Sequence, residues 1–306
     1  MGRLSVPVLT LISGYLLFSS KLDRIPFKLY KKKFFTLVIP FFFFNVVYFS
    51  LQYALEYFFH VAPLFNLVEL DRHMIIRRLT SYDGMPLNDP LHFLRDLVVL
   101  VMIAPLFGFF IRNAPFIGLN IVFVMFMSDL DGHFVNRNTM AVLFYIGGWA
   151  AVRRWDVRSL DRFALWGVAL LFFACATMMF YRISSYTYLY LIAPFAVWPA
   201  SSMLVNTYIG KLAVMASKYS FYLFLIHTPI IRVLQLVYPR LSNWVSPNVY
   251  LVLSFVSILV FTYVSYNLAN IVFPRAFSFV IGGRVKRSTE DTKITTVPIA
   301  VEKFST

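Results

Sequence analysis

Residues 34–58 read FFTLVIPFFFFNVVYFSLQYALEYF, an apolar run of the length that crosses a bilayer. The whole chain of 306 residues is 59% hydrophobic and only 14% charged, with 34 Phe and 18 Tyr. A soluble domain has about half apolar and about a quarter charged residues. Long apolar runs are typical of helices in lipid, where each segment must satisfy its own backbone hydrogen bonds. The sequence therefore predicts an all-α, polytopic transmembrane helix bundle.

Eight further apolar runs accompany this one, so we expect nine spans: 4–20, 34–58, 92–111, 115–128, 140–152, 163–181, 188–206, 219–238 and 249–273. The fourth and fifth runs are short for a span. Either the flanks of loop 129–139 extend them, or they are re-entrant. Residues 1–274 are expected to form the transmembrane domain. The polar, Ser/Thr-rich residues 275–306 are expected to form a disordered cytoplasmic tail.

The net charge of +14 is distributed as a topology signal. Nineteen Lys and Arg residues fall on the side of loops 21–33 and 153–162 and the C-terminus, and seven fall on the other side. The basic side should be cytoplasmic, which predicts a multi-pass protein of the bacterial inner membrane. No nucleic-acid-binding motif is evident, and nucleic acid is not an expected partner. Cys175 is the single cysteine, so neither a disulfide framework nor a Cys metal site is expected.

The same count places Met1 outside, three residues before a membrane helix and with no upstream export signal. We therefore expect that one helix precedes the present start and that the complete fold has ten helices. The alternative is a truncated copy of the gene. The charged loop 59–91, which is also on the outer side, could form part of a substrate mouth.

Two charged residues, Arg95 and Asp96, lie one turn into the third run, where an ionised group is costly and functional by default. Their positions on a helix point them about 100° apart, so we expect no pairing between them. Arg95 could bind a phosphate or carboxylate through its planar fork, or it could extend to the outer interface. Asp96 could bind substrate, or it could bond a neighbouring helix.

His227 lies near the middle of its run, with Ser220 seven residues earlier on the same face and Pro229 just after it. This spacing predicts a polar stripe and an internal cavity that contains both side chains. His227 is either catalytic or a helix-packing residue. Arg232, one turn further, could line the same path.

Two more motifs have a structural and a functional interpretation. Ser13-Gly14 could be a close helix contact or part of a substrate site. The run of Lys31, Lys32 and Lys33 could be a lipid-headgroup signal, or it could attract the phosphates of a cytosolic cofactor such as coenzyme A.

Four segments together resemble the membrane-bound acyltransferase family 3, whose members O-acylate surface and exported polysaccharides. They are the run from Val6 to Leu16 with its Ser-Gly pair, the run from Lys31 to Phe41 followed by Asn45, the run from His92 to Leu97, and the run from Tyr219 to Pro229. The matches stand in the family's order. His92 replaces the family's usual Trp. The sequence around Ser13-Gly14 also resembles that of the branch that succinylates or acetylates rhizobial exopolysaccharide.

The resemblance implies transfer of an acetyl or succinyl group from acyl-CoA to a hydroxyl of a polysaccharide or a lipid-linked sugar, directly or through an acyl-enzyme, with no metal. The family's general base is a His on its first helix, before Met1, which leaves His227 as the deep candidate here. Arg95 would be its catalytic partner. Asp96, Ser13, Ser220 and Arg232 would bind substrate, and Lys32 and Lys33 would bind the cofactor. The rival hypotheses are an inactive family member and a transporter or flippase. A transporter would show inverted repeats, and none is apparent.

Overall fold

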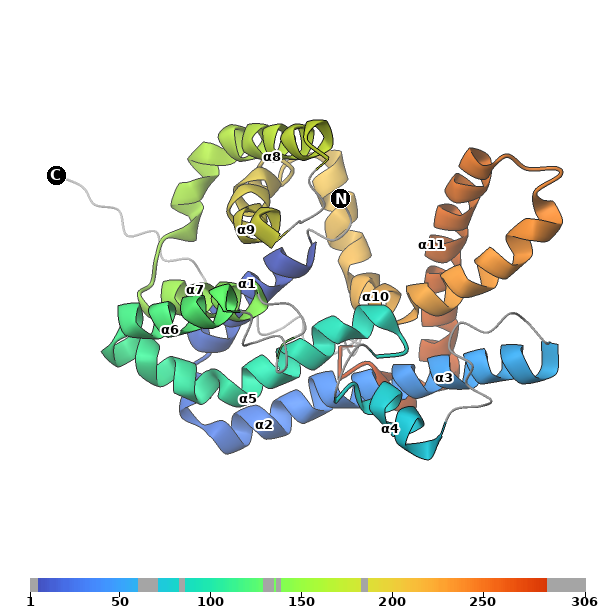
Figure 1. Ribbon diagram of the computed structural model, residues 1–306, viewed down its shortest axis with the longest axis horizontal. Coiled ribbons are helices and arrows are strands. Elements are labelled where there is room, and N and C mark those ends of the chain that lie inside the picture. Colours follow the sequence, from blue (N-terminus) through green and yellow to red (C-terminus); the bar gives the residue numbers. More distant parts are fainter. Residues whose placement is uncertain are drawn as a thin grey trace.

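The computed structural model describes residues 5–59, 71–82, 86–128, 135, 139–182 and 187–284. All nine expected apolar segments are helical: α1 (Ser5–Ser19), α3 (Ile39–Phe59), α5 (His92–Asn113), α6 (Pro115–Met127), α7 (Thr139–Val152), α8 (Ala164–Phe180), α9 (Thr187–Ser202), α10 (Tyr208–Leu241) and α11 (Pro247–Val272). Strands are absent from this described part. The all-α prediction is confirmed (Figure 1).

Five helical stretches are long and apolar enough to cross a membrane, namely 26–58, 89–113, 157–180, 208–241 and 247–272. The other four, α1, α6, α7 and part of α9, are shorter apolar helices. The count of nine spans therefore stays a prediction. Most of loop 129–139, including the ends that would lengthen α6 and α7, lies outside the described residues.

Large apolar side chains cover the outside of the bundle. Phe172, Phe180 and Leu251 are 76%, 81% and 71% exposed. Water would penalise such a surface, and a bilayer would not. The protein is therefore a multi-pass membrane protein.

The basic stretch before the second apolar run is helical, where a loop was expected. Pro26 begins α2 (Pro26–Lys33), a π-helical turn follows at Phe34–Val38, and α3 continues to Phe59. Pro is favoured at a helix start because its missing N–H is not needed there. Lys32 and Lys33 therefore lie on the same continuous helix as the apolar run, which extends along the molecule (Figure 1).

Helices α1 and α7 make the closest crossing in the bundle. A Cβ atom on Gly14 would collide with the Phe144 carbonyl, and one on Gly147 would collide with the Leu11 carbonyl. Two glycines therefore allow the backbones to touch, as small residues do between membrane helices. This confirms the helix-contact interpretation for Gly14.

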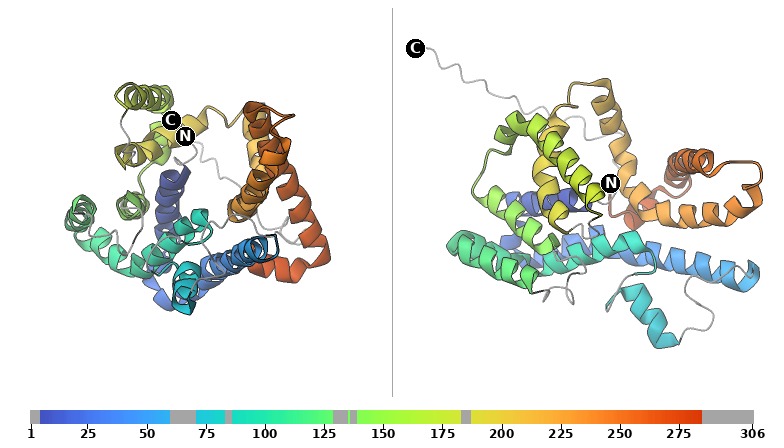
Figure 2. Two further views of the ribbon diagram at one scale, coloured as in Figure 1. Left: turned by 45° about the vertical axis from the view of Figure 1, so that its right-hand side comes forward. Right: turned by 45° about the horizontal axis from the view of Figure 1, so that its top comes forward.

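Helix α10 is longer than the run that predicts it, and it bends sharply (Figure 1). Pro229 lies inside the helix and removes a backbone donor, which is a usual cause of a kink. The second arm of α10 and α11 form one edge of the molecule, and α8 and α9 form another (Figure 2).

The first residues of the expected tail are ordered. Pro274–Val280 forms α12, in which Phe277 is buried, and Ile281 is buried just after it. Apolar side chains at these positions pack on the bundle, so the boundary at 274 falls too early. Residues 285–306, the rest of the predicted tail, lie outside the described residues.

Candidate functional site

Arg95 and Asp96 form an ion pair in the first turn of α5. Arg95 Nη1 donates to Asp96 Oδ1 at 2.9 Å, and Arg95 Nε donates to the Ser81 carbonyl at 3.2 Å. Asp96 is fully buried, and 11% of the Arg95 side chain is exposed. The expectation that the two do not pair was wrong. Their Cβ bonds diverge, but the long arginine side chain, bonded to Ser81, folds back over the carboxylate and offsets part of its burial cost.

Asn45 ties the last turn of α4 (Arg72–Thr80), and Asn88 just before α5, to α3. Its Nδ2 donates to the carbonyls of Arg78, at 3.1 Å, and Leu79, at 2.7 Å, and its Oδ1 accepts from the Asn88 amide at 3.1 Å. Both asparagines are fully buried. A buried amide satisfied in this way holds its surroundings in one arrangement. The loop that carries Ser81 is thereby positioned for its bond to Arg95.

Asn88 also reaches the bend of α10. Its Nδ2 lies 3.1 Å from the Leu225 carbonyl oxygen. Leu225 is four residues before Pro229, which has no N–H to donate to that carbonyl. The amide of Asn88 therefore replaces the missing helical donor, and it ties α10 to the start of α5.

Helix α3 has a buried polar face that the sequence reasoning missed, apart from Asn45. Tyr48, Gln52 and Glu56 are 3%, 0% and 9% exposed. Gln52 Nε2 donates to the Tyr48 hydroxyl at 3.0 Å. The signal was available in the sequence, because positions 45, 48, 52 and 56 recur at the spacing of one helix face.

Arg232 and Asp89 lie close enough to Tyr48 to interact with it electrostatically. Asp89 begins the short 3-10 turn Asp89–Leu91, and its carbonyl accepts from Nδ1 of the buried His92. Buried polar groups from α3, from the start of α5 and from α10 therefore form a strip along one face of α3. We call the set the polar cluster: Asn45, Tyr48, Gln52, Glu56, Asn88, Asp89, His92, Arg95, Asp96 and Arg232.

His227 and Ser220 do not share a cavity in the part of the chain that the structure describes. Ser220 is exposed, and its hydroxyl donates to the Ser217 carbonyl at 2.7 Å. His227 is half-buried, and its Nδ1 lies 3.1 Å from the Leu223 carbonyl. Seven-residue spacing aligns two side chains only on a straight helix, and α10 bends. Their functional roles stay predictions.

The imidazole of His227 has a defined tautomer. A carbonyl oxygen can only accept, so the bond to Leu223 requires the proton on Nδ1. In the neutral ring, Nε2 then holds the lone pair that a general base needs. His227 is two residues from Leu225, which binds Asn88 of the polar cluster.

A second group, which we call the basic cluster, consists of Lys32, Lys33 and Arg284. The charges of Lys32 and Arg284 both act on Lys33. The Arg284 guanidinium carbon lies 3.4 Å from the centre of the Phe221 ring. The sequence indicated the two lysines but not Arg284, because residues 275–306 were expected to form a disordered tail.

The two clusters lie at separate levels of one helix. Lys33 and Asn45 are 12 residues apart on the continuous α2–α3 helix. At 1.5 Å per residue this corresponds to about 18 Å. Ser13 is half-buried in α1 beside the Gly14 crossing, and none of its described contacts ties it to either cluster.

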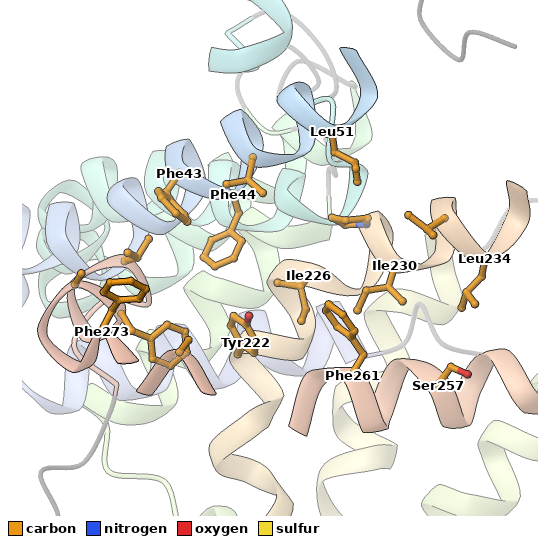
Figure 3. Close-up of a pocket in the computed structure, with 17 residues that line it drawn as sticks. Phe43, Phe44, Leu51, Tyr222, Ile226, Ile230, Leu234, Ser257, Phe261 and Phe273 are labelled. Atoms are coloured by element: carbon orange, nitrogen blue, oxygen red, sulfur yellow. The ribbon is translucent and has the colours of Figure 1, made fainter. Parts of the chain in front are cut away.

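A large pocket, of about 820 Å³, opens between α3, α10, α11 and α12. Figure 3 shows its lining, which includes Phe43 and Phe44 from α3, Ile226 and Ile230 from α10, and Phe261 from α11. Nearly every lining group is apolar. A sugar or a phosphate would lose its hydrogen bonds to water there, so the pocket suits hydrocarbon and not the reacting groups.

Comparison with known proteins shows which family this chain is similar to. A family model described as an acyltransferase domain matches residues 1–267. Succinoglycan biosynthesis protein ExoH of Rhizobium meliloti (strain 1021) is 25% identical over 303 residues, which cover 92% of this chain and 80% of that protein. No solved structure matches the chain.

Proposed function

The chain belongs to the acyltransferase family whose domain model covers residues 1–267, and on that premise we propose that it moves an acetyl or succinyl group from acyl-CoA to a sugar hydroxyl of an exported polysaccharide. Membership makes the chain a membrane acyltransferase that transfers groups other than amino-acyl groups and acts on polysaccharide. The donor, the acyl group and the inner-membrane location are the proposed part. The relative in Rhizobium meliloti is a succinoglycan biosynthesis protein, which supports an exopolysaccharide acceptor.

One observation carries the proposal: a single helix has cations at one level and buried polar groups at another. The basic cluster suits the phosphates of a cytosolic thioester. The polar cluster offers hydrogen-bond partners for a sugar inside an otherwise apolar bundle. The positive-inside rule assigns the basic end to the cytoplasm, with the C-terminus.

In the proposed reaction, the sugar hydroxyl oxygen attacks the thioester carbonyl carbon. The carbon–oxygen bond forms, the carbon–sulfur bond breaks, and the hydroxyl proton leaves with coenzyme A as its thiol. His227 Nε2 takes the proton from the hydroxyl and returns it to the sulfur, a role worth about 10²–10⁴-fold in rate. Arg95 polarises the carbonyl oxygen while Asp96 holds the guanidinium in place.

The remaining roles concern binding. Arg232 and the polar face of α3 would contact the acceptor, since both face Tyr48. Lys32 and Lys33 would hold the donor phosphates. Ser13 and Ser220 stay in the proposal as substrate contacts only through the resemblance of their segments.

Transfer by purified protein tests the proposal. The protein in nanodiscs receives acetyl-CoA or succinyl-CoA labelled in the acyl group, together with chemically de-O-acylated exopolysaccharide. We expect label in the polymer that mild alkali removes, because an ester forms. Release of label as free acid alone, or no turnover of either thioester, contradicts the proposal.

A further inference from the structure

Lys33 interacts electrostatically with Arg284 where α12 ends, Lys32 is its neighbour in the chain, and the described part of the chain gives these cations no acidic partner. The ion pairs among the described residues join Arg95 to Asp96 and Arg112 to Asp23, away from this place. Lys33 is half-buried, whereas Lys32 and Arg284 are exposed. Like charges held together destabilise each other unless an anion lies between them.

Packing fixes Arg284 at this position. Phe277 of α12 makes edge-to-face contacts with Tyr222, at 5.3 Å between ring centres, and with Tyr266, at 5.2 Å. Phe279 makes a similar contact with Phe35, at 6.1 Å, in the π-helical turn next to Lys33. Edge-to-face aromatic pairs contribute beyond the area that they bury. Helix α12 is thereby fastened to both α10 and the lysine-bearing helix.

The turn after α12 then directs the chain toward the lysines. Gly282 and Gly283 have φ values of 73° and 72°, a region that side chains rarely adopt. A Cβ on Gly282 would lie 2.9 Å from the Thr36 Cα atom. The glycine pair therefore allows the backbone to touch the π-helical turn, and the next residue is Arg284.

Phe221 holds the guanidinium without neutralising it. A cation over an aromatic face is attracted by the ring, while its charge stays available. Arginine presents a planar fork of N–H donors that matches phosphate, and lysine adds a compact charge. One arginine and two lysines around an exposed space are a combination suited to a phosphate monoester or diphosphate.

We infer that Arg284 is the third cationic residue of a phosphate-binding site formed with Lys32 and Lys33, and that this site takes the phosphates of the acyl-CoA donor. The inference rests on the proposed function and extends it to a residue outside the matched family region, which ends at 267. In this arrangement, α12 and the glycine turn after it close one side of the donor site.

Binding of adenosine 3′,5′-bisphosphate, which carries the 3′-phosphate and the first 5′-phosphate of coenzyme A without the thioester, tests the inference apart from catalysis. The full chain is placed in phosphatidylcholine nanodiscs and titrated by calorimetry. Arg284→Gln should weaken binding about ten- to a hundredfold, the loss expected for a charge-assisted bond. The matched control is Arg275→Gln, an exposed arginine at the other end of α12 with no contact to the lysines, and it should bind as the wild type does.

Kinetics provide a second readout. Arg284→Gln should raise KM for acyl-CoA and leave kcat near the wild-type value, because the residue holds the donor and not the reacting atoms. Equal helicity and thermal unfolding of the two variants would show that neither is misfolded.

The opposing outcomes are distinct. Unchanged bisphosphate affinity in Arg284→Gln, with a wild type that binds, overturns the role of Arg284 and leaves the proposed function standing. A wild type that acylates sugar but binds no bisphosphate also overturns the site. Absence of both binding and transfer counts against the proposed donor itself. If phosphatidylglycerol in the nanodiscs abolishes bisphosphate binding, the site belongs to a lipid headgroup, and the inference fails.

Discussion

The side-chain amide of Asn88 lies 3.1 Å from the Leu225 carbonyl, the one that Pro229 leaves without a helical donor. This bond joins the bend of α10 to the loop that also contacts Asn45 and precedes Arg95. A proline within a helix leaves one backbone carbonyl without its helical hydrogen-bond donor, and inside a membrane no water can replace that donor. The bend and the polar cluster therefore depend on each other.

The first prediction follows from this dependence. Asn88→Ala should lower the free energy of unfolding by about 1–3 kcal/mol, because the Leu225 carbonyl stays buried without a donor. In a Pro229→Ala background the new N–H at position 229 can serve that carbonyl, so the same substitution should cost less. A double-mutant cycle by thermal unfolding in nanodiscs measures the difference. Equal costs in both backgrounds would show that the two residues are independent.

The second prediction concerns Arg95. Arg95→Lys keeps the charge but loses Nε, which bonds Ser81, and the planar fork. Turnover should fall about ten- to a hundredfold, the equivalent of one charge-assisted hydrogen bond, while expression and membrane insertion stay unchanged. Near-normal acylation by this variant would instead make Arg95 a structural partner of Asp96 and Ser81 with no part in the reaction.

The third prediction separates catalysis from packing at His227. His227→Gln can still bond the Leu223 carbonyl through its amide but cannot cycle a proton near neutral pH. Unfolding temperature should therefore be preserved, and kcat should fall by about 10²–10⁴-fold. A variant that keeps both stability and turnover would assign His227 to helix packing alone.

The fourth prediction addresses the polar face of α3. Gln52→Leu keeps the size of the side chain and removes the bond to the Tyr48 hydroxyl. KM for the sugar acceptor should rise by about tenfold, the value of one lost hydrogen bond of about 1.4 kcal/mol, with KM for acyl-CoA unchanged. The control is Gln235→Leu, an exposed glutamine on α10. A change in KM for acyl-CoA instead of KM for the sugar would show that the sugar does not bind at the polar face of α3.

Composition and run length were sufficient to predict the nine apolar helices, because lipid imposes one rule on every segment that crosses it. They were insufficient for α12, because its buried Phe277, with Ile281 just after the helix, lies in a short apolar stretch next to a long polar one. Single intramembrane charges drew attention to Arg95 and Asp96. Their pairing, however, depends on Ser81, which lies 14 positions earlier and reaches Arg95 only through the fold of the loop.

The polar face of α3 shows a different limit. Asn45, Gln52 and Glu56 are ordinary residues one by one, and only their shared face, buried against the loop and α10, gives them a role. Helical spacing could have shown that face. The bond between Asn88 and Leu225 could not be predicted, since it joins residues 137 positions apart through a backbone atom.

In the proposed reaction, donor and acceptor meet across the bilayer, with the thioester on the side of the basic cluster. Inside-out and right-side-out membrane vesicles test it most directly, with acyl-CoA and de-O-acylated exopolysaccharide supplied on chosen sides. We predict acylation only when acyl-CoA faces Lys32 and Lys33 and the polymer is on the opposite side. Acylation that requires both substrates on one side of the membrane would contradict a reaction across the bilayer.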